Sequence, residues 1–149
     1  MYTAKEVLVT FNATINGYEE IYRAAAKSFG LSDCAFWILY YIRQSKEKVT
    51  QKDICSFIYQ PKQTVHSALK KMVDDGLIEV GDYNGKRHKY VTLTEKGEAF
   101  SQKTVDLVLA EEIAAFEDMD ASERELAMKL LAKYSDNLSR RMSKFRYDE

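Results

Sequence analysis

The chain has 149 residues, a length that corresponds to one domain or to a small domain with an appended oligomerisation arm. Its composition, 46% hydrophobic and 30% charged, is that of a folded protein and excludes a disordered one. The formal net charge is −1, but residues 43–92 hold ten Lys/Arg against six Asp/Glu, so the middle of the chain is basic at +4 and the remainder carries −5.

The sequence gives no indication of a membrane or secreted protein. Its longest apolar stretch, residues 34–42, is far too short to cross a bilayer. The N-terminal segment has no basic stretch followed by an apolar core and a cleavage site. Two cysteines and two histidines, scattered over different elements, match no disulfide framework or metal spacing. We therefore expect a cytoplasmic protein without membrane contact, metal or cofactor.

Two helices are predicted at the start of the chain. Thr3 and Glu6 fit a capping box, and Gly30 is placed to end the helix that follows. Apolar residues recur along this helix in alternating steps of three and four, at Leu8, Phe11, Ile15, Tyr18, Tyr22, Ala25 and Phe29. Ser32 can cap a second helix, and this helix is apolar nearly all round, which indicates burial.

A short third helix and an amphipathic fourth helix follow. The cap signature at 50–53 opens the third helix, which runs to about Phe57. Pro61, the only proline, is favoured at the first helical position and therefore starts the fourth helix, which Gly76 ends. One face of the fourth helix is apolar, with Val65, Ala68, Leu69 and Met72. The same spacing on the polar side gives Gln63, His66, Ser67 and Lys70.

After Gly76 the period becomes that of strands. Residues 77–83 and 86–94 flank Asn84–Gly85, a strong signal for a two-residue hairpin turn. Thr94 can cap a fifth helix. Ser122 and Glu125 fit a capping box for a sixth, whose apolar stripe is Leu131, Tyr134, Leu138, Met142 and Phe145. The predicted fold is mainly α with a small β-hairpin wing (α+β): a winged helix-turn-helix domain with N- and C-terminal helical arms.

The polar side of the fourth helix is typical of a helix that reads DNA. Amides and hydroxyls can hydrogen-bond base edges in the major groove, and a lysine can meet phosphate or guanine. An ordinary surface helix would also have a polar face, but the short helix before it and the hairpin after it favour DNA. At the hairpin tip, Lys86, Arg87 and Lys89 can reach the minor groove. A cross-strand ion pair between Asp82 and Arg87 is the alternative role for that arginine.

Three stretches resemble successive blocks of the MarR family of winged-helix regulators: "LSDCAFWILYYI" (31–42), "TQKDICSFIYQPKQTVHSALKKMVDDGLIEV" (50–80) and "KRHKYVTLTEKG" (86–97). The resemblance implies a homodimer, with a winged domain over 31–94 and a dimerisation region made of 1–30 and 95–149. It also implies binding to a pseudo-palindromic operator on double-stranded DNA, most often as a repressor. Apolar stripes at both ends of the chain independently favour a partner chain, although a monomeric helical packing stays open.

The resemblance also implies roles for single residues. Thr64 and Lys70 match phosphate contacts, and Arg87 matches the family's minor-groove arginine. The family's usual aspartate two residues before that arginine is Gly85 here, and Asp82 is the candidate to take its place. The full set of candidate DNA-binding residues is Thr50, Gln51, Lys62, Gln63, Thr64, His66, Ser67, Lys70, Lys86, Arg87 and Lys89.

Members of this family usually respond to a small molecule held between the dimer arm and the winged domain, or to cysteine oxidation. Aromatic residues of the first two helices are candidates for a pocket that takes a small aromatic or phenolic effector: Tyr18, Tyr22, Phe36, Trp37, Tyr40 and Tyr41. Such residues also form ordinary cores. Cys34, in the first turn of its helix, is placed where the helix end favours thiolate, with core packing as the alternative.

Two other functions compete with a regulator. A winged-helix module that docks onto protein would bind DNA weakly and with little salt dependence. An enzyme would need a phosphate loop, a nucleophile–histidine arrangement or a carboxylate pair in a recognisable motif, and the sequence has none of these. The basic middle third favours a DNA-binding regulator over both.

Overall fold

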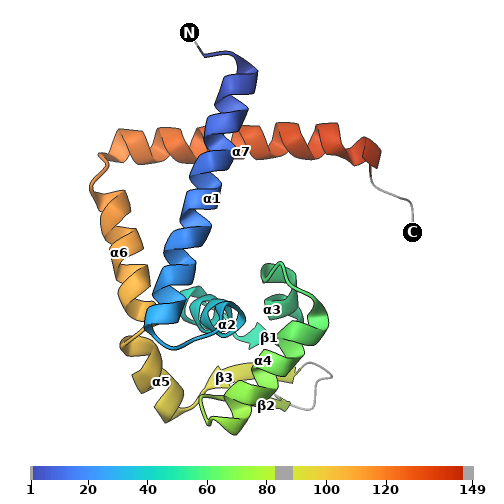
Figure 1. Ribbon diagram of the computed structural model, residues 1–149, viewed down its shortest axis with the longest axis vertical. Helices are drawn as coiled ribbons and strands as arrows, with labels where there is room; N and C mark the ends of the chain where they lie inside the picture. Colours follow the sequence, from blue (N-terminus) through green and yellow to red (C-terminus); the bar gives the residue numbers. More distant parts are fainter. Residues whose placement is uncertain (1, 83–88, 146–149) are drawn as a thin grey trace. The chain divides into compact units, whose positions relative to one another are not determined.

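The computed structural model describes residues 2–82 and 89–145, and the chain divides into two compact units, Met1–Leu109 and Ala110–Glu149. The α-helices are α1 (Ala4–Ser28), α2 (Asp33–Gln44), α3 (Gln51–Phe57), α4 (Lys62–Asp74), α5 (Glu95–Gln102), α6 (Val105–Glu117) and α7 (Ala121–Met142). The strands are β1 (Val49–Thr50), β2 (Ile78–Asp82) and β3 (Lys89–Leu93), and a 3₁₀ turn, η1 (Ser143–Phe145), follows α7 (Figure 1). The predicted division into a winged domain over 31–94 and a dimerisation region stays a prediction.

The first unit contains a winged helix. Its three strands form an antiparallel sheet in the order β1-β3-β2, with Val91 of β3 opposite both Val49 and Val80. Helices α2, α3 and α4 precede the β2–β3 hairpin, and α4 contacts both α2 and β2. The predicted fold class, mainly α with a small hairpin wing, is confirmed. The two-residue strand β1 was not predicted, because a stretch this short has no readable alternation.

The core of this unit lies where α2, α3, α4 and the sheet meet. Phe36, Ile38 and Leu39 of α2 are fully buried, as their nearly uniform apolar surroundings in the sequence indicated. The predicted apolar face of the fourth helix is confirmed: Val65, Leu69 and Met72 are buried and Ala68 is half-buried. This packing determines which side of α4 is turned outward.

Helix ends follow the predicted caps in most places. Side chains of Thr3, Ser32, Thr50 and Thr94 accept backbone N–H groups at the starts of α1, α2, α3 and α5. Gly30 and Gly76 have positive φ of 69°, as helix-terminating glycines do. Pro61, predicted to occupy the first helical position, instead lies one residue before α4, and its carbonyl accepts the Thr64 N–H at 2.9 Å.

Two predictions for the C-terminal third are wrong. The predicted fifth helix is two helices, α5 and α6, separated at Lys103–Thr104, where the Thr104 hydroxyl donates to the Phe100 carbonyl at 2.8 Å. The cap of the last helix is Asp120 rather than Ser122. Asp120 accepts the backbone N–H groups of Ser122 and Glu123, and its bond with the Ser122 hydroxyl is the main cause of its lowered pKa.

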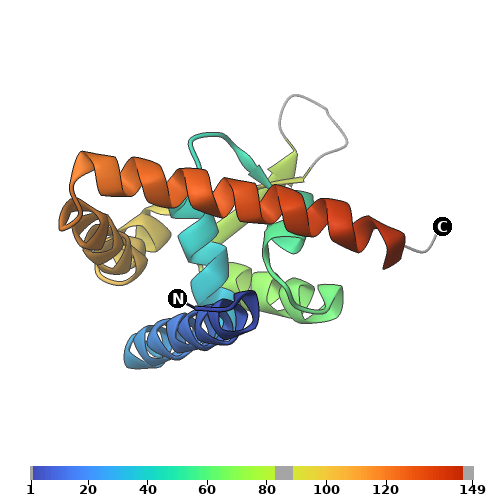
Figure 2. The same ribbon diagram turned by 90° about the horizontal axis from the view of Figure 1, so that it is seen from above.

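The second unit consists of the end of α6 and the long helix α7, which is continuous along its length in Figure 2. The Arg124 guanidinium donates to the Phe116 carbonyl at 3.1 Å and to the Met119 carbonyl, which ties α7 to the turn before it. None of the residues in α7 is buried. Among the described residues, no helix combines the length and the apolar character needed to cross a membrane.

Candidate nucleic-acid interface

The polar face of α4 is accessible along its whole length. Gln63, His66, Ser67 and Lys70 are all exposed, on the side of the helix away from the buried stripe. Lys62 and Thr64 are exposed as well. The Ser67 hydroxyl donates to the Gln63 carbonyl at 2.9 Å, so its oxygen remains free to accept a hydrogen bond from a partner.

Charge is distributed unevenly along α4. Its first turn carries no acidic residue, whereas Asp74 and Asp75 lie at the C-terminal end. The carboxylate of Asp75 is 2.9 Å from Lys71, so these two exposed charges are paired with each other. The N-terminal turns therefore present Lys62 to an incoming polyanion without a neighbouring carboxylate on the same helix, whereas Lys70, in the third turn, lies four residues before Asp74.

The start of α3 is held by a reciprocal cap. The Thr50 hydroxyl donates to Asp53 at 2.6 Å and accepts the Asp53 N–H at 3.1 Å. Both Thr50 and Gln51 are half-buried. The hydroxyl of Thr50 is thus already used in capping α3, and Gln51 is the more available of the two for an outside contact.

The wing departs from its predicted register. Asp82 lies opposite Lys89, whereas a two-residue turn at Asn84–Gly85 would place it opposite Arg87. The predicted Asp82–Arg87 pairing is therefore wrong, because six residues separate Asp82 from its actual partner. Lys89 is exposed at the start of β3. The predicted turn and the candidates Lys86 and Arg87 lie outside the described residues.

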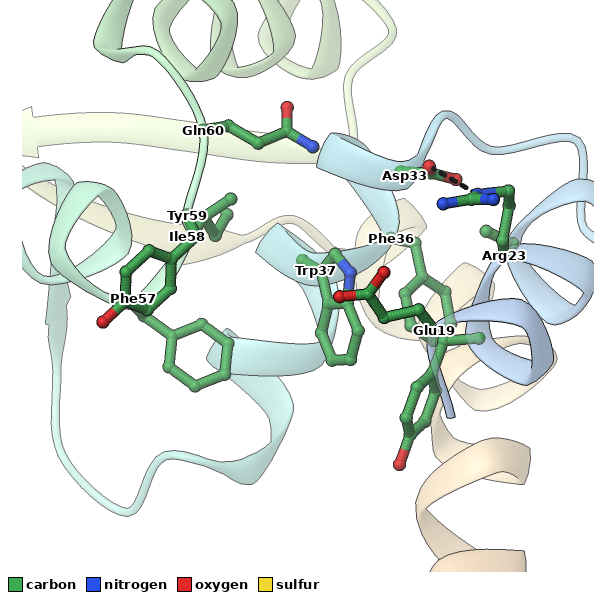
Figure 3. Close-up of a pocket in the computed structure, with 11 residues that line it drawn as sticks. Glu19, Arg23, Asp33, Phe36, Trp37, Phe57, Ile58, Tyr59 and Gln60 are labelled. Atoms are coloured by element: carbon green, nitrogen blue, oxygen red, sulfur yellow. Dashed lines mark ion pairs between the residues drawn. The ribbon is translucent and has the colours of Figure 1, made fainter. Parts of the chain in front are cut away.

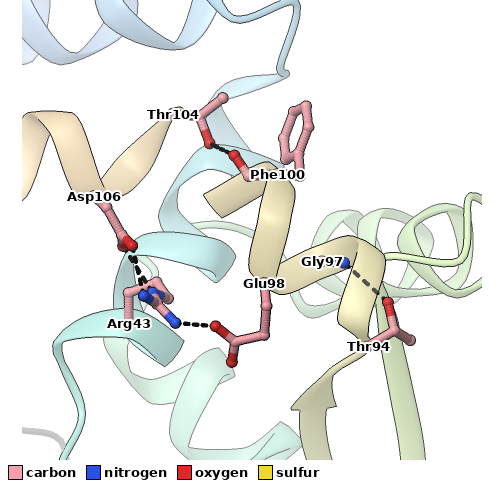
Figure 4. A network of polar contacts seen from close by, with 7 residues as sticks. All are labelled: Arg43, Thr94, Gly97, Glu98, Phe100, Thr104 and Asp106. Carbon is pink, nitrogen blue, oxygen red and sulfur yellow. Dashed lines mark hydrogen bonds and ion pairs between the residues drawn. The ribbon is translucent and has the colours of Figure 1, made fainter. Parts of the chain in front are cut away.

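The C-terminal end of α4 is anchored by the segment that opens α5. The Thr94 hydroxyl accepts the Gly97 N–H at 3.0 Å (Figure 4). The same hydroxyl donates to the Gly76 carbonyl at 2.6 Å. The Lys96 ammonium donates to the Asp75 carbonyl at 2.6 Å. A side chain at Gly97 would overlap the Leu77 carbonyl oxygen. The segment 94–97, in which Thr94 was predicted as a helix cap and which also belongs to the family resemblance, thus positions the exposed helix.

A three-residue ionic cluster links α2 to the segment after the wing. The Arg43 guanidinium donates to both carboxylate oxygens of Asp106, at 2.7 and 2.5 Å, and also to Glu98 (Figure 4). The hydrogen bonding that Arg43 donates to Asp106 is the main cause of a raised Arg43 pKa, so the cation is retained at any physiological pH. Sequence analysis missed this cluster, because 63 residues separate Arg43 from Asp106.

Tyr59 is a second feature that the sequence analysis did not single out. It lies in the turn between α3 and α4, and its relative exposure of 102% is that of a side chain without neighbours. The signal available in the sequence was a tyrosine two residues before Pro61, in the turn between two predicted helices.

A cavity of about 360 Å³ lies between α1, α2 and the turn before α4 (Figure 3). Of the six predicted effector residues, Tyr22, Phe36 and Trp37 line it. The others do not: Tyr40 packs edge-on against Trp37 at 5.1 Å, and Tyr41 stacks on Phe57 at 4.4 Å. Tyr18 is exposed on α1.

The environment of Cys34 disfavours the thiolate. Only 4% of the residue is exposed, and burial raises the pKa of its thiol, with a smaller contribution from Cys55. The effect of the helix end, predicted to favour thiolate, is outweighed by desolvation. Within the described part of the chain, no group of three or more His, Cys, Asp or Glu is arranged to hold a metal ion.

Residues 29–88 match the model of the MarR family. A MarR family regulator from Neisseria meningitidis has the same fold with a TM-score of 0.76 at 21% identity, over 93% of this chain and 98% of that one. A MarR/EmrR family regulator from Acinetobacter sp. ADP1 gives 0.68 at 18% identity, over 94% and 99%. BpsR of Bordetella bronchiseptica, whose DNA binding is regulated by 6-hydroxynicotinic acid, gives 0.63 at 20% identity, over 91% and 98%.

No curated protein is significantly similar in sequence to the chain. The family model covers the helix-turn-helix segment with its flanks, and the solved structures agree with the chain over nearly its full length. The resemblance predicted from the sequence is confirmed: the chain carries the MarR family's helix-turn-helix segment and has the winged-helix fold of MarR family transcriptional regulators.

Proposed function

We propose that this protein is a homodimeric, sequence-specific DNA-binding transcriptional regulator of the cytoplasm, acting as a repressor and not as an enzyme. It binds a pseudo-palindromic operator with α4 in the major groove and the wing in the minor groove. The observation that carries this proposal is the exposure of every polar side chain on the outer face of α4, whose other face is buried in the core.

Each exposed side chain of α4 has a role that follows from its chemistry. Gln63, His66 and Ser67 offer neutral donors and acceptors for base edges. Lys62, Thr64 and Lys70 are suited to phosphate oxygens. Candidates outside α4 complete the interface: Thr50 and Gln51 at the start of α3, and Lys86, Arg87 and Lys89 of the wing.

Exposed apolar side chains support the homodimer. On α1 they include Leu8 and Ile15, and on α7 they include Leu131 and Leu138. Contiguous exposed apolar surfaces of this kind usually mark an interface with another protein chain. In most homo-oligomers the two copies bury such surfaces against each other across a two-fold axis. A two-fold axis would place the two copies of α4 about 34 Å apart, one turn of DNA.

The cavity beside α1 and α2 supports regulation by a small aromatic or phenolic effector, as DNA binding of the similar protein BpsR is regulated by 6-hydroxynicotinic acid. An effector changes DNA affinity only if it binds one arrangement of the two recognition helices more tightly than the other. Because the turn before α4 forms one wall of the cavity, a bound molecule would touch the segment that leads into α4.

The proposal is tested with DNA fragments that the protein retains from its own genome, measured by fluorescence anisotropy over a range of salt. Several phosphate contacts make affinity fall steeply with salt. Lys70→Ala should weaken binding by about threefold to tenfold and reduce the salt slope by about one. Lys71→Ala is the matched control, because that lysine is already paired with Asp75 and should change binding little.

Two results would contradict the proposal. One is specific affinity that stays unchanged at physiological salt in both Lys70→Ala and Arg87→Ala. The other is binding too weak to distinguish the retained fragments from random DNA. Either result would favour the alternative of a winged-helix module that docks onto another protein.

A further inference from the structure

The cavity between α1, α2 and the α3–α4 turn has an aromatic lining. Tyr22 and Trp37 lie with their ring centres 4.9 Å apart at 58°, and Phe57 meets the edge of Trp37 at 6.4 Å. Such rings present negative π faces as well as apolar surface, and a cation is attracted to them when it replaces water at that position.

The charged residues at this cavity carry a net negative charge. Glu19 and Arg23 extend from α1 and Asp33 from α2 (Figure 3). The Arg23 guanidinium is 3.6 Å from the Asp33 carboxylate and is therefore already paired. Glu19 forms no ion pair within the described part of the chain. Among the lining residues of that part, two carboxylates thus face one guanidinium.

We infer that this cavity binds an organic cation, with a quaternary ammonium or a delocalised positive charge next to an aromatic ring, in preference to an aromatic carboxylate. The ring of such a molecule packs among Tyr22, Trp37 and Phe57, and its charge lies near the Glu19 carboxylate. Aromatic side chains combined with a nearby carboxylate are the usual means of recognising quaternary ammonium groups. As the class of the regulatory effector, this inference rests on the proposed function.

The charges at the cavity disfavour an anionic ligand. Its carboxylate has one guanidinium to bind, and Arg23 would first have to leave Asp33 or share with it. Glu19 and Asp33 would then repel the bound anion across a short distance. Charge complementarity therefore separates the two ligand classes even though both have an aromatic ring that suits the lining.

The position of the cavity explains how a bound ligand could change the affinity of the protein for DNA. Phe57, the last residue of α3, and residues 58–60 of the turn between α3 and α4 form one wall. Tyr59 belongs to this wall, and its side chain is fully exposed to solvent. A cation held against Phe57 thus lies beside the turn that leads into the first turn of the recognition helix.

Trp37 is the only tryptophan in the chain, so its fluorescence reports occupancy of the cavity directly and without DNA. Three probes with one phenyl ring are compared by fluorescence and by calorimetry: phenyltrimethylammonium, neutral benzyl alcohol and anionic benzoate. We expect phenyltrimethylammonium to bind at least about threefold more tightly than either of the others.

Matched variants identify the charge responsible. Glu19→Gln should weaken the binding of phenyltrimethylammonium by about threefold to tenfold and leave benzyl alcohol unchanged. Glu20→Gln, a change at the next residue of α1 and outside the cavity, should affect neither probe. Arg23→Gln should strengthen binding of the cation, since it leaves Asp33 without its partner.

Benzoate binding as tightly as phenyltrimethylammonium would overturn the inference, and so would the absence of binding by all three probes in calorimetry. Because these measurements contain no DNA, they fail or succeed independently of the proposed regulator function. A protein that binds the cation but no DNA would refute the function and leave the cavity assignment intact. A protein that binds DNA but no cation would refute the cavity assignment and leave the regulator function intact.

Discussion

Single residues at 94–97 hold the junction between β3 and α5 against the end of α4. Thr94 caps α5 and at the same time donates to the Gly76 carbonyl at the end of α4, and Lys96 satisfies the carbonyl of Asp75. Gly97 allows the α5 backbone to lie directly against Leu77. Two side chains, those of Thr94 and Lys96, and the absence of one at Gly97 therefore hold the C-terminal end of α4 in place.

Gly97→Ala tests the close approach at this junction. The added methyl group would overlap the Leu77 carbonyl, a backbone atom that cannot move aside without displacing β2. We expect the free energy of unfolding to fall by about 2–4 kcal/mol, measured by urea denaturation. Gly17→Ala, in the interior of α1 with no atom within 4 Å of the new methyl group, is the control and should stabilise by about 1 kcal/mol. Equal effects of the two changes would refute the role given to Gly97.

Cys34 provides a prediction about reactivity. Burial raises the pKa of its thiol, and the thiolate is the form that reacts with alkylating agents and peroxide. Labelling of Cys34 in the native protein should therefore be slower than that of an exposed thiol by about tenfold or more, and should accelerate on adding urea. A Cys55→Ser variant isolates the reaction of Cys34. Rapid native labelling of that variant would instead indicate a redox-sensing cysteine.

At the scale of elements, the sequence predicted what depends on local patterns. Caps at Thr3, Thr50 and Thr94 and the stops at Gly30 and Gly76 all lie within four residues of the groups they satisfy. The buried and exposed faces of α4 follow from the spacing of its apolar residues alone. These features were sufficient to identify the helix-turn-helix and the polar face that forms the candidate site.

The elements that were missed depend on information that no local pattern contains. The break between α5 and α6 has neither glycine nor proline at Lys103–Thr104. Asp120 and Ser122 each begin a possible capping box, and both sequences look equally suitable. Half of the predicted effector residues do not line the cavity, because helical spacing does not say which neighbour each aromatic ring meets.

The ionic cluster of Arg43 is the clearest long-range feature of this kind, and it makes a testable contribution to stability. Its side chain is 24% exposed and binds Asp106 through two parallel hydrogen bonds. Arg43→Met should lower the free energy of unfolding by about 1–3 kcal/mol, since it leaves Asp106 without a partner. Arg23→Met is the control, because its pair with Asp33 is exposed and contributes less than about 1 kcal/mol. If both changes cost the same, the cluster is no more than a surface ion pair.

At the scale of the whole molecule, the exposed apolar surface of α7 needs an explanation that the single chain does not supply. Leu131, Tyr134 and Leu138, which share one side of the helix, are 47%, 41% and 41% exposed. Helix formation in α7 depends on its Asp120 cap and on packing, and a long helix with no buried side chain gains little from its own chain. A second copy that covers this surface would provide the missing burial.

Leu131→Asp combined with Leu138→Asp tests this directly, since two carboxylates on the apolar stripe of α7 would have to be desolvated in a dimer. We expect the wild-type protein to sediment as a dimer and the double variant as a monomer. Lys133→Asp, which changes charge on the opposite side of the same helix, should remain dimeric. The monomer should bind a pseudo-palindromic operator at least about a hundredfold more weakly, because its two half-sites are no longer bound by one linked molecule. A double variant that stays dimeric would place the subunit contact elsewhere, whereas a monomeric wild type would refute the homodimer and remove the reason for a palindromic operator.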